Sequence, residues 1–248
     1  ESVWGTGETL TANTTYWYRL KCRNGDGVET NYSNIGAKAT KIEDTGGIEF
    51  ESVSPSVIRV VPVRKEYTNL EIYNAGIKIE CVTTGESSGW RGTTVYWQHT
   101  ALNPNTLYTY RGISRNSAGL AGNWSQEYST YTLCYTPQAP TVTTLSTGSM
   151  NIYLNGYVSG DVTEVAIAVS TDTLWSVTRY VNYDGTLSEE EVWGTKMDFG
   201  GDGGVDIKGL EANKRHNIKV KARNLANIET AYSGVVTRYT YIEQCVSA

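Results

Sequence analysis

The sequence is poor in the residues on which most catalytic and metal sites depend. It contains two histidines and four cysteines among 248 residues, and neither a Cys-x-x-Cys nor a His-Glu-x-x-His motif occurs. Redox-active dithiols and zinc proteases are therefore not indicated. No glycine-rich run leads from a strand into a helix, so a phosphate-binding loop is not predicted either. We accordingly expect a protein that is not an enzyme and has no catalytic residues.

Excess positive charge and long apolar runs are lacking as well. The chain has 21 Lys and Arg residues against 26 Asp and Glu residues, a formal net charge of −5. Binding to nucleic acid requires a basic surface, and crossing a membrane as a helix requires about 18 or more consecutive apolar residues. The sequence opens on Glu1-Ser-Val-Trp, which resembles the middle of a strand, so any signal peptide is expected upstream. No nucleic-acid partner and no membrane span are predicted.

What the sequence does contain is a repeat of 24 residues. Its copies are Leu10–Ser33, Leu102–Ser125 and Leu210–Ser233, and they align without a gap. The first copy agrees with the second at 11 positions and with the third at 10. The copies start 92 and 108 residues apart. Each copy therefore marks one domain of roughly a hundred residues.

Side chains alternate within each copy of the repeat. In the first copy Tyr16, Tyr18 and Leu20 fall on one face, and basic residues fall on the other. A period of two predicts a half-buried strand. The segment Asn24–Gly27 follows as a turn, and a second strand runs back from Ser33. Each repeat is therefore predicted to be a β-hairpin.

The second copy resembles the F and G strands of a fibronectin type III domain. It matches Leu-x-Pro-x-Thr-x-Tyr along strand F and Asn-x-Ala-Gly in the turn, through Leu102, Pro104, Thr106, Tyr108, Asn116, Ala118 and Gly119. The third copy departs from the pattern, with His216 in place of the tyrosine and Lys214 in place of the threonine. We expect His216 to have a satisfied structural role. The resemblance, to modules strung along bacterial surface and secreted proteins, implies an all-β fold of tandem antiparallel β-sandwiches, fibronectin type III or immunoglobulin-like.

The resemblance implies three domains and a tail. Residues 1–41 correspond to strands E to G of one domain, 44–134 to a complete domain, 136–242 to a complete domain with insertions, and 243–248 to a tail. The strands predicted in the two complete domains are Ile48–Val53, Val57–Val63, Gly76–Val82, Thr93–His99, Ser149–Leu154 and Glu164–Ser170.

Two further segments of the third domain carry predictions. Val192–Thr195 repeats the Val-Trp-Gly-Thr of Val3–Thr6, and we assign both to strand E or its approach. Leu187–Trp193 is predicted to form a single helical turn. The prolines of the 136–140 linker are expected to stiffen the join between the two complete domains.

Residues 1–41 pose a problem of burial. Chains shorter than about 40 residues rarely support a hydrophobic core, so this segment cannot bury Tyr16, Tyr18 and Leu20 alone. The interpretation that we favour is that the protein continues upstream. The alternative is that another chain supplies the missing strands.

The four cysteines do not form a predicted disulfide framework. Cys22 falls at an inward position of a strand and Cys81 continues an apolar period of two, so both are expected in cores. Cys134 and Cys245 each follow a domain's last strand and would lie at opposite ends of the third domain, too far apart to bridge. We expect free thiols. The alternative is that Cys134 or Cys245 forms an inter-chain linkage, and cysteine usage leaves the compartment open.

One stretch is a candidate metal site. Asp198, Asp202 and Asp206 place three carboxylates among four glycines, and carboxylate oxygens are the ligands that Ca²⁺ prefers. Their spacing matches neither an EF-hand loop nor the Gly-Gly-x-Gly-x-Asp repeat. We favour a flexible polar hairpin without any cofactor, and a calcium site is the alternative.

The outward faces of the predicted F strands are basic. Arg111 and Arg115, together with the loop residue Trp90, are candidate binding residues for a polyanion such as a cell-wall or extracellular polysaccharide. The interpretation that we favour is a solvated sheet face, partly paired with acids on neighbouring strands.

These observations favour a structural function, although a fold does not decide a function. We expect a non-catalytic spacer or adhesion segment of a larger extracellular or cell-surface protein, whose partners are other domains of that protein or copies of itself. One alternative is a subunit of an extracellular filament, sheath or virus tail whose N-terminal half domain is completed by a neighbouring chain. Another is a set of accessory domains in a secreted polysaccharide-degrading enzyme.

Overall fold

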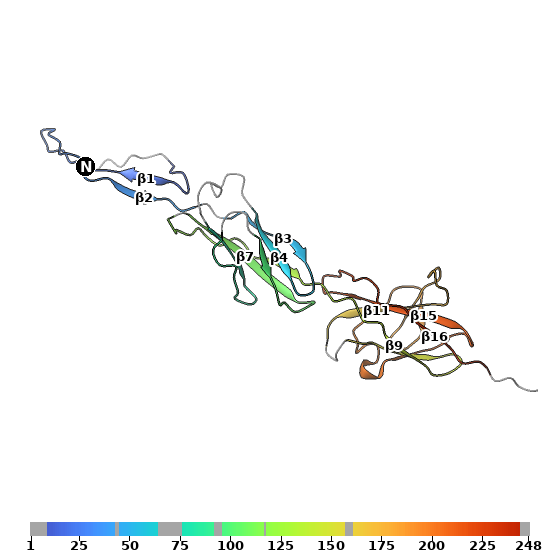
Figure 1. The fold of residues 1–248 in the computed structure, drawn as a ribbon. Helices are drawn as coiled ribbons and strands as arrows, with labels where there is room; N and C mark the ends of the chain where they lie inside the picture. Colours follow the sequence, from blue (N-terminus) through green and yellow to red (C-terminus); the bar gives the residue numbers. More distant parts are fainter. Residues whose placement is uncertain are drawn as a thin grey trace, which may run out of the picture. The chain divides into compact units, whose positions relative to one another are not determined.

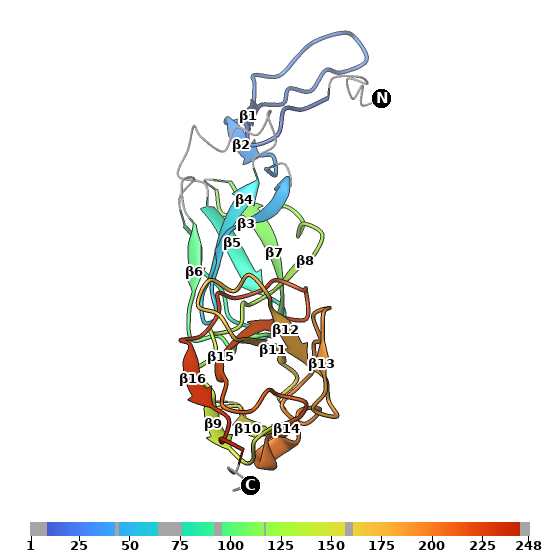
Figure 2. The same cartoon turned by 90° about the vertical axis from the view of Figure 1, so that its right-hand side faces the viewer.

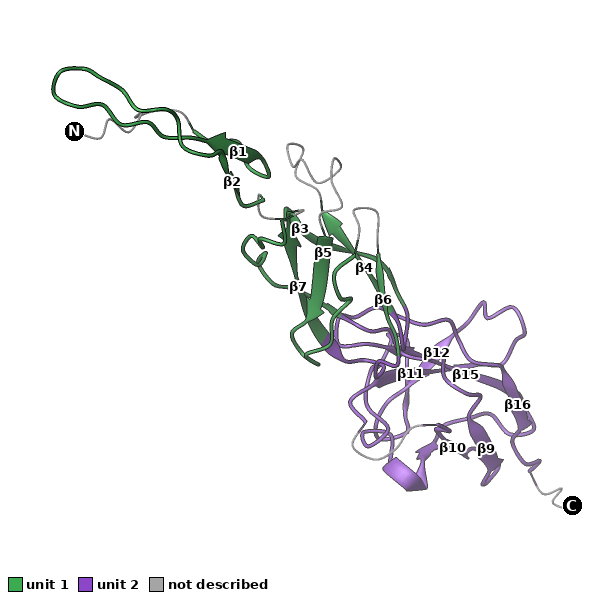
Figure 3. Ribbon diagram, turned by 60° about the vertical axis from the view of Figure 1, so that its left-hand side comes forward, with its two compact units in different colours: residues 1–53, 58–100, 108–130 green, residues 54–57, 101–107, 131–248 purple. Residues whose placement is uncertain are grey.

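A computed structural model of the chain describes residues 9–42, 45–63, 76–91, 96–116, 118–156 and 161–243. In this part of the chain the regular structure consists of β-strands and a short 3₁₀ turn. The strand pairs are antiparallel, so the all-β fold predicted from the sequence is confirmed. The chain divides into two compact units, which Figure 3 colours separately. The predicted domain boundaries stay a prediction.

Unit 1 comprises residues 1–53, 58–100 and 108–130. It begins with the hairpin of β1 (Thr15–Tyr18) and β2 (Gly36–Ala39), drawn in blue in Figure 1. The hairpin predicted from the first repeat therefore forms, although its strands are short. Tyr18 and Leu20 are exposed, because no second sheet in the described residues covers this hairpin.

Most of the second repeat also lies in unit 1. One sheet contains β3 (Gly47–Val53), β4 (Ile58–Val63) and β6 (Trp97–His99), and the other contains β5 (Gly76–Cys81), β7 (Leu107–Arg115) and β8 (Tyr128–Tyr131). Alternate side chains of these strands, among them Ile58, Val60, Ile79 and Tyr110, are buried. The alternation confirms the half-buried strands expected from the period of two.

Unit 2 comprises residues 54–57, 101–107 and 131–248. Its smaller sheet contains β9 (Thr141–Thr144), β10 (Met150–Tyr153) and β14 (Val205–Ile207). Its larger sheet, seen in Figure 2, is ordered β13 (Leu187–Ser188), β12 (Arg179–Val181), β11 (Glu164–Ser170), β15 (Arg215–Arg223) and β16 (Val236–Tyr239). Apolar side chains of both sheets form one buried core, which includes Met150, Ile167, Phe199 and Ile218.

The strand predictions agree with the structure where it describes the chain. The predicted strands starting at Ile48 and Glu164 are confirmed to within one residue at each end. The prediction that began at Thr93 is partly outside the described residues, and its end forms β6.

Two predictions for the third repeat are wrong. Leu187 and Ser188 form strand β13, because Val181 and Tyr180 of β12 offer them an open edge, so no helical turn starts there. The segment around Trp193 is not strand E. Gly194 bridges Val165 in the larger sheet, whereas β14, twelve residues further along, pairs with β10 in the position that strand E takes.

Candidate functional site

Two features of the chain recur from repeat to repeat: a row of cations stacked on aromatic rings, and a hydrogen bond that joins one repeat to the next. The first lies on the exposed face of the β5–β7–β8 sheet. The guanidinium carbon of Arg115 lies 4.5 Å from the centre of the Trp90 ring, and that of Arg111 lies 4.4 Å from the centre of the Trp124 ring. The structure thus brings together two of the three predicted binding residues, Trp90 and Arg115, and places Arg111 on a different ring.

The same row occurs in unit 2. Arg223, the repeat equivalent of Arg115, lies 4.5 Å from the ring centre of Trp193. Lys219, the equivalent of Arg111, lies 4.0 Å from the ring centre of Tyr232. The bridges of Arg91 to Ile77 and of Gly194 to Val165 place Trp90 and Trp193 beside equivalent strands. In the first hairpin Arg19 stacks on Tyr32 in the same way, at 3.8 Å.

Carboxylates neutralise much of the charge on this row. Arg111 forms an ion pair with Glu80 at 2.7 Å, and Arg223 pairs with Glu164 at 2.6 Å. Lys221 is nearly buried, and its Nζ atom lies 2.7 Å from both Glu191 and Glu229. Burial opposes the charge on Lys221, but hydrogen bonds to the two glutamates prevail and raise the pKa of Lys221 above its ordinary value.

The row is therefore better suited to holding strands together than to capturing a polyanion. Each cation–aromatic contact at an exposed site contributes about 0.5–1 kcal/mol, and exposed ion pairs contribute up to about 1 kcal/mol. The contacts link each F strand to a neighbouring strand and to the loop that carries Trp90 or Trp193. Binding of a polysaccharide here stays a prediction.

The second recurring feature is a hydrogen bond between neighbouring repeats. In unit 2 the side-chain amide of Asn224 donates to the backbone carbonyl of Thr132 at 3.1 Å. In unit 1 the side-chain amide of Asn116 donates to the carbonyl of Thr40 at 2.6 Å. We call Asn24, Asn116 and Asn224 the turn asparagines, because they occupy one position of the repeat, and Thr40, Thr132 and Thr240 the anchor threonines.

The anchor threonines are held identically. The hydroxyl of Thr132 donates to the carbonyl of Asn103 at 2.6 Å and accepts the backbone N–H of Thr106 at 3.0 Å. Thr40 and Thr240 make the equivalent pairs of bonds. With its hydroxyl used inside its own repeat, each anchor threonine can offer its carbonyl to the next one.

Further contacts support the bond in unit 2. The carboxamide oxygen of the buried Asn105 accepts the backbone N–H of Leu225 at 2.8 Å, and its amide lies 3.3 Å from the Thr163 hydroxyl. Cys134, two residues after the anchor threonine, packs into the core of unit 2. The sequence analysis gave no role to Asn105, Thr163 or Leu225. The recurring Arg-Asn pair of the repeat was the signal that could have identified the turn asparagines.

The thiols behave differently from one another. Burial raises the pKa of Cys134, and a hydrogen bond to Thr163 opposes that shift only in part. A buried thiol with a raised pKa is poorly placed for an inter-chain disulfide. Cys81 is buried as expected, whereas the prediction that Cys22 is buried is wrong, because no second sheet in the described residues covers its hairpin. Cys245 lies outside the described residues.

The structure gives separate partners to the three aspartates for which a calcium site was the alternative interpretation. Asp198 accepts the backbone N–H and the hydroxyl of Thr195, both at 2.7 Å. Asp202 pairs with Lys196 at 2.8 Å, and Asp206 accepts the amide of Asn151 at 2.8 Å. In the described part of the chain no group of three or more Asp, Glu, His or Cys side chains could hold a metal ion.

The expected flexible hairpin is not observed there either. Phe199 is buried in the core of unit 2, a 3₁₀ turn spans Gly201–Gly203, and β14 follows directly. Burial of the phenylalanine ties this segment to the sandwich, so its glycines serve a compact turn.

Gly85-Glu-Ser-Ser-Gly89 matches the spacing of the nucleophile-elbow motif but not its context. The elbow requires a strand that leads into a helix, whereas this segment is a turn whose Ser87 bridges Glu80 of β5. The one histidine nearby, His99, has both ring nitrogens occupied, by the Tyr110 hydroxyl at 3.0 Å and by Glu86 at 2.9 Å. It is thus engaged as a structural residue.

His216 is buried, but its predicted satisfied role is wrong. The tyrosine at the same position of the first repeat, Tyr16, accepts the backbone N–H of Thr11 at 2.7 Å. Neither ring nitrogen of His216 has a hydrogen-bond partner among the described residues. Burial lowers the pKa of His216 from its ordinary value, and the nearby backbone of Glu211, the equivalent of Thr11, opposes this shift only in part.

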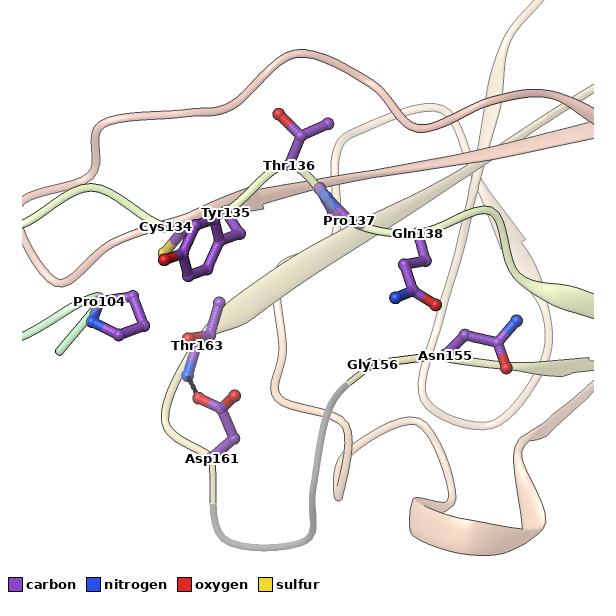
Figure 4. Close-up of a pocket in the computed structure, with 10 residues that line it drawn as sticks. All are labelled: Pro104, Cys134, Tyr135, Thr136, Pro137, Gln138, Asn155, Gly156, Asp161 and Thr163. Carbon is purple, nitrogen blue, oxygen red and sulfur yellow. Dashed lines mark hydrogen bonds between the residues drawn. The ribbon is translucent and has the colours of Figure 1, made fainter. Parts of the chain in front are cut away.

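Figure 4 shows a pocket in unit 2 beside Cys134, between the segment Tyr135–Gln138 and Thr163. Its volume is about 270 Å³, slightly below the 300–1,000 Å³ or so typical of ligand sites. Asp161 in its wall accepts the backbone N–H of Thr163 at 2.8 Å. Cys134 and Asp161 both line the pocket, and burial together with the Asp161 charge raises the pKa of the thiol. In the part of the chain that the structure covers, no helix is long and apolar enough to cross a membrane.

No family model matches the sequence, and no curated protein matches it. The chain is similar to the structure of the FN1–FN3 domains of chicken CNTN1, with 16% identity and a TM-score of 0.35, over 91% of this chain and 77% of that one. It is also similar to a two-domain fibronectin type III segment of chicken tenascin, with 8% identity and a TM-score of 0.47, over 79% of this chain and 98% of that one. The description of the fold rests on the strand order and pairing, and not on these two similarities.

Proposed function

We propose that this chain is a non-catalytic spacer segment of a larger extracellular or cell-surface protein. The observation that carries the proposal is the recurring hydrogen bond from a turn asparagine to an anchor threonine, made by Asn116 with Thr40 and by Asn224 with Thr132. A module selected for an isolated activity does not need the same hydrogen bond between every pair of repeats. A segment that transmits position or tension along a chain does need it.

The joints are built to restrict bending. The donor asparagines are buried in both cases, and a buried, satisfied polar group costs free energy when it is pulled out of its bond. Asn105 adds a second bond beside Asn224, and Cys134 anchors the linker in the core of unit 2. The prolines at 137 and 140 limit the backbone freedom of the same linker.

The row of stacked cations fits the same role. It connects neighbouring strands of the β5–β7–β8 sheet and of the larger sheet of unit 2. A sheet reinforced along its face resists shear between its strands, which suits a load-bearing module better than a binding one.

The experiment that tests the proposal is ¹⁵N relaxation of the whole chain and of Asn224→Asp. Aspartate keeps the shape of the side chain and the acceptor oxygen but loses the donor. If the joint restricts bending, residues 101–107 and 131–136 tumble with the same correlation time as β11 and β15 in the native chain and with a shorter one in the variant. Asn34→Asp, an exposed asparagine of the first hairpin, is the matched control. Independent tumbling in the native chain would contradict the proposal.

A second candidate function is a subunit of an extracellular filament, sheath or tail. It is favoured by the exposed aromatic and apolar side chains of the first hairpin, including Trp17, Tyr18 and Leu20. An exposed apolar surface of this kind is typical of a site that binds another protein chain. If another chain covers this hairpin, the fluorescence of Trp17 should be protected from a quencher dissolved in the solvent. This protection should be seen at high protein concentration.

A further inference from the structure

A further pocket in unit 2 lies next to the buried imidazole of His216. Its volume is about 220 Å³, and His216 forms part of its wall. The apolar part of the wall comes from β11, β13 and the loops beside them, through Val169, Val177, Leu187 and Leu210. An apolar cavity of about 150 Å³ is large enough to hold benzene, so this pocket has room for one substituted aromatic ring.

The pocket lies where the other two repeats place a phenol ring. His216 occupies the repeat position of Tyr16 and Tyr108. The Tyr108 side chain is buried in its own repeat, with 4% exposed. Imidazole is a smaller ring and carries no hydroxyl group. The third repeat therefore has neither the volume nor the hydrogen bond that a tyrosine supplies at this corner.

Hydrogen-bonding groups at this corner are left without partners. Both ring nitrogens of His216 are buried, and among the described residues neither forms a hydrogen bond, although the backbone of Glu211 lies close by. In the first repeat the N–H of Thr11 donates to the Tyr16 hydroxyl at 2.7 Å. The equivalent N–H of Glu211 has no acceptor in the part of the chain that the structure describes. A buried polar group without a partner is unfavourable, so the pocket is suited to a ligand that supplies one.

The charged groups at the rim are each paired with a counter-charge. Arg179 forms an ion pair with Glu189 at 2.7 Å, and Glu211 forms one with Lys214 at 3.2 Å. Burial lowers the pKa of His216, so its neutral form predominates above pH 6.5. A neutral imidazole has one N–H donor and one acceptor nitrogen. The pocket thus favours an uncharged ligand with a polar group that both donates and accepts.

The pocket can be reached directly from solvent. Val177 in its wall is 59% exposed, and Glu211 is exposed as well. Asn103, the equivalent of Glu211 in the second repeat, is also exposed, although a third repeat follows it. An open corner is thus found in the interior of the chain as well as in the third repeat.

We propose that this pocket binds a small, uncharged phenol. The aromatic ring would lie between Val169, Leu187 and Leu210. The hydroxyl would donate to a ring nitrogen of His216 and accept the N–H of Glu211. A phenolic hydroxyl is uncharged at neutral pH and both donates and accepts, so it meets the two requirements of the site.

Other small ligands fit the pocket less well. A sugar ring carries hydroxyl groups around its whole edge, and apolar walls cannot satisfy them. A carboxylate would have to displace Glu189 from Arg179. The inference is independent of the spacer function, because it concerns the corner of one repeat and not the joints between repeats.

The test is an NMR titration of the whole ¹⁵N-labelled chain with p-cresol, which is the side chain of tyrosine as a free molecule. Saturable shifts are expected for the N–H groups of Val169, Leu187 and Glu211 at pH 7.5. Toluene has the same shape without the hydroxyl and is the matched ligand control. It is expected to bind about tenfold more weakly, because it makes no hydrogen bond. Equal affinities for the two ligands would overturn the proposal.

The decisive variant is His216→Tyr, because its own phenol ring occupies the place of the ligand. Tyr16 and Tyr108 show that tyrosine is compatible with this corner, and the amide spectrum of β15 reports whether the variant is folded. The variant is expected to lose the saturable shifts. Val235→Thr, at a position that is 50% exposed and outside the pocket, is the control and is expected to keep them.

Two further results would overturn the proposal. One is a native chain that shows no saturable shifts with p-cresol, which would leave solvent as the occupant of the pocket. The other is a folded His216→Tyr variant that binds p-cresol as tightly as the native chain, which would place the ligand elsewhere. Neither result bears on the spacer function, which is tested separately through the relaxation of Asn224→Asp.

Discussion

The side-chain amide of Asn224 lies 3.1 Å from the carbonyl oxygen of Thr132, and 108 residues earlier Asn116 makes the same bond with Thr40. Each bond joins a turn in one repeat to the residue that follows the last strand of the repeat before it. The connection between repeats is thus specified by the repeat itself, and not only by the linker.

Loss of the donor at this joint should have a measurable cost. In Asn224→Asp the Thr132 carbonyl loses its partner and faces a carboxylate, and an unsatisfied buried polar group costs about 1–3 kcal/mol. We expect faster hydrogen exchange in residues 131–136 with little change in β11. An equal loss of protection throughout unit 2 would indicate that Asn224 stabilises the whole sandwich instead of the joint.

Replacing His216 by tyrosine should stabilise unit 2. Tyrosine can restore the corner bond that Tyr16 makes with Thr11, a gain of about 1 kcal/mol. Because burial lowers the pKa of His216 below 6.5, the unfolded state takes up a proton that the folded state does not as the pH falls below that value. The native chain therefore loses stability on acidification. The tyrosine of His216→Tyr takes up no proton in this pH range, so the variant should not show this loss of stability.

The measurement for His216→Tyr is hydrogen exchange of β15 at pH 7.5 and pH 5.5. The advantage of the variant is expected to be larger at the lower pH. An advantage that does not change with pH would show that the pKa of His216 is the same in the folded and the unfolded state.

Lys221 should be the most sensitive of the stacked cations. Lys221→Met leaves Glu191 and Glu229 facing each other without their shared partner, which we expect to cost about 1–3 kcal/mol. Burial alone would raise the pKa of Glu191, but hydrogen bonds to Lys221 prevail and lower it. The stability from this pair is present above the ordinary pKa of 4.5 and is lost as the pH falls through the lowered value.

Urea unfolding of Lys221→Met and of the native chain at several pH values measures this effect. The difference should shrink as the pH falls below 4.5. Lys38→Met, on exposed strand β2, is the control. A difference that persists unchanged in acid would mean that the methionine disturbs packing and that the ion pairs contribute little.

Calcium should not stabilise the chain through the aspartates of the third repeat. Asp198, Asp202 and Asp206 bind Thr195, Lys196 and Asn151 respectively, so no shared cavity is available to the ion. We expect the same Tm in millimolar Ca²⁺ and in chelator, measured by differential scanning fluorimetry. A rise of several degrees that Asp202→Asn abolishes would restore the calcium interpretation.

Much of the fold follows from local patterns in the sequence. The alternation along Tyr108 and Tyr110 predicts strand β7, and the repeat predicts the hairpin around Asn116, because a period of two and turn chemistry both act over a few residues. The row of basic residues on the F strands was also visible, as was the exposed position of Trp90.

The tertiary structure alone decided which residues meet. Trp193 belongs to a segment that the sequence assigns to strand E, but the pairing of Met150 with Ile207 gives that place to β14 and frees Trp193 to stack on Arg223. Edges of a sheet are filled by whichever segment satisfies the backbone bonds and buries its apolar face, and that competition is not local.

The hydrogen bonds between repeats also depend partly on the local sequence and partly on the tertiary structure. The sequence by itself determined that Asn24, Asn116 and Asn224 recur, since identical residues at a fixed repeat position can be read directly. Only the tertiary structure decided that two of these amides reach a threonine carbonyl 76 and 92 residues away, because that contact depends on where the preceding repeat ends in space.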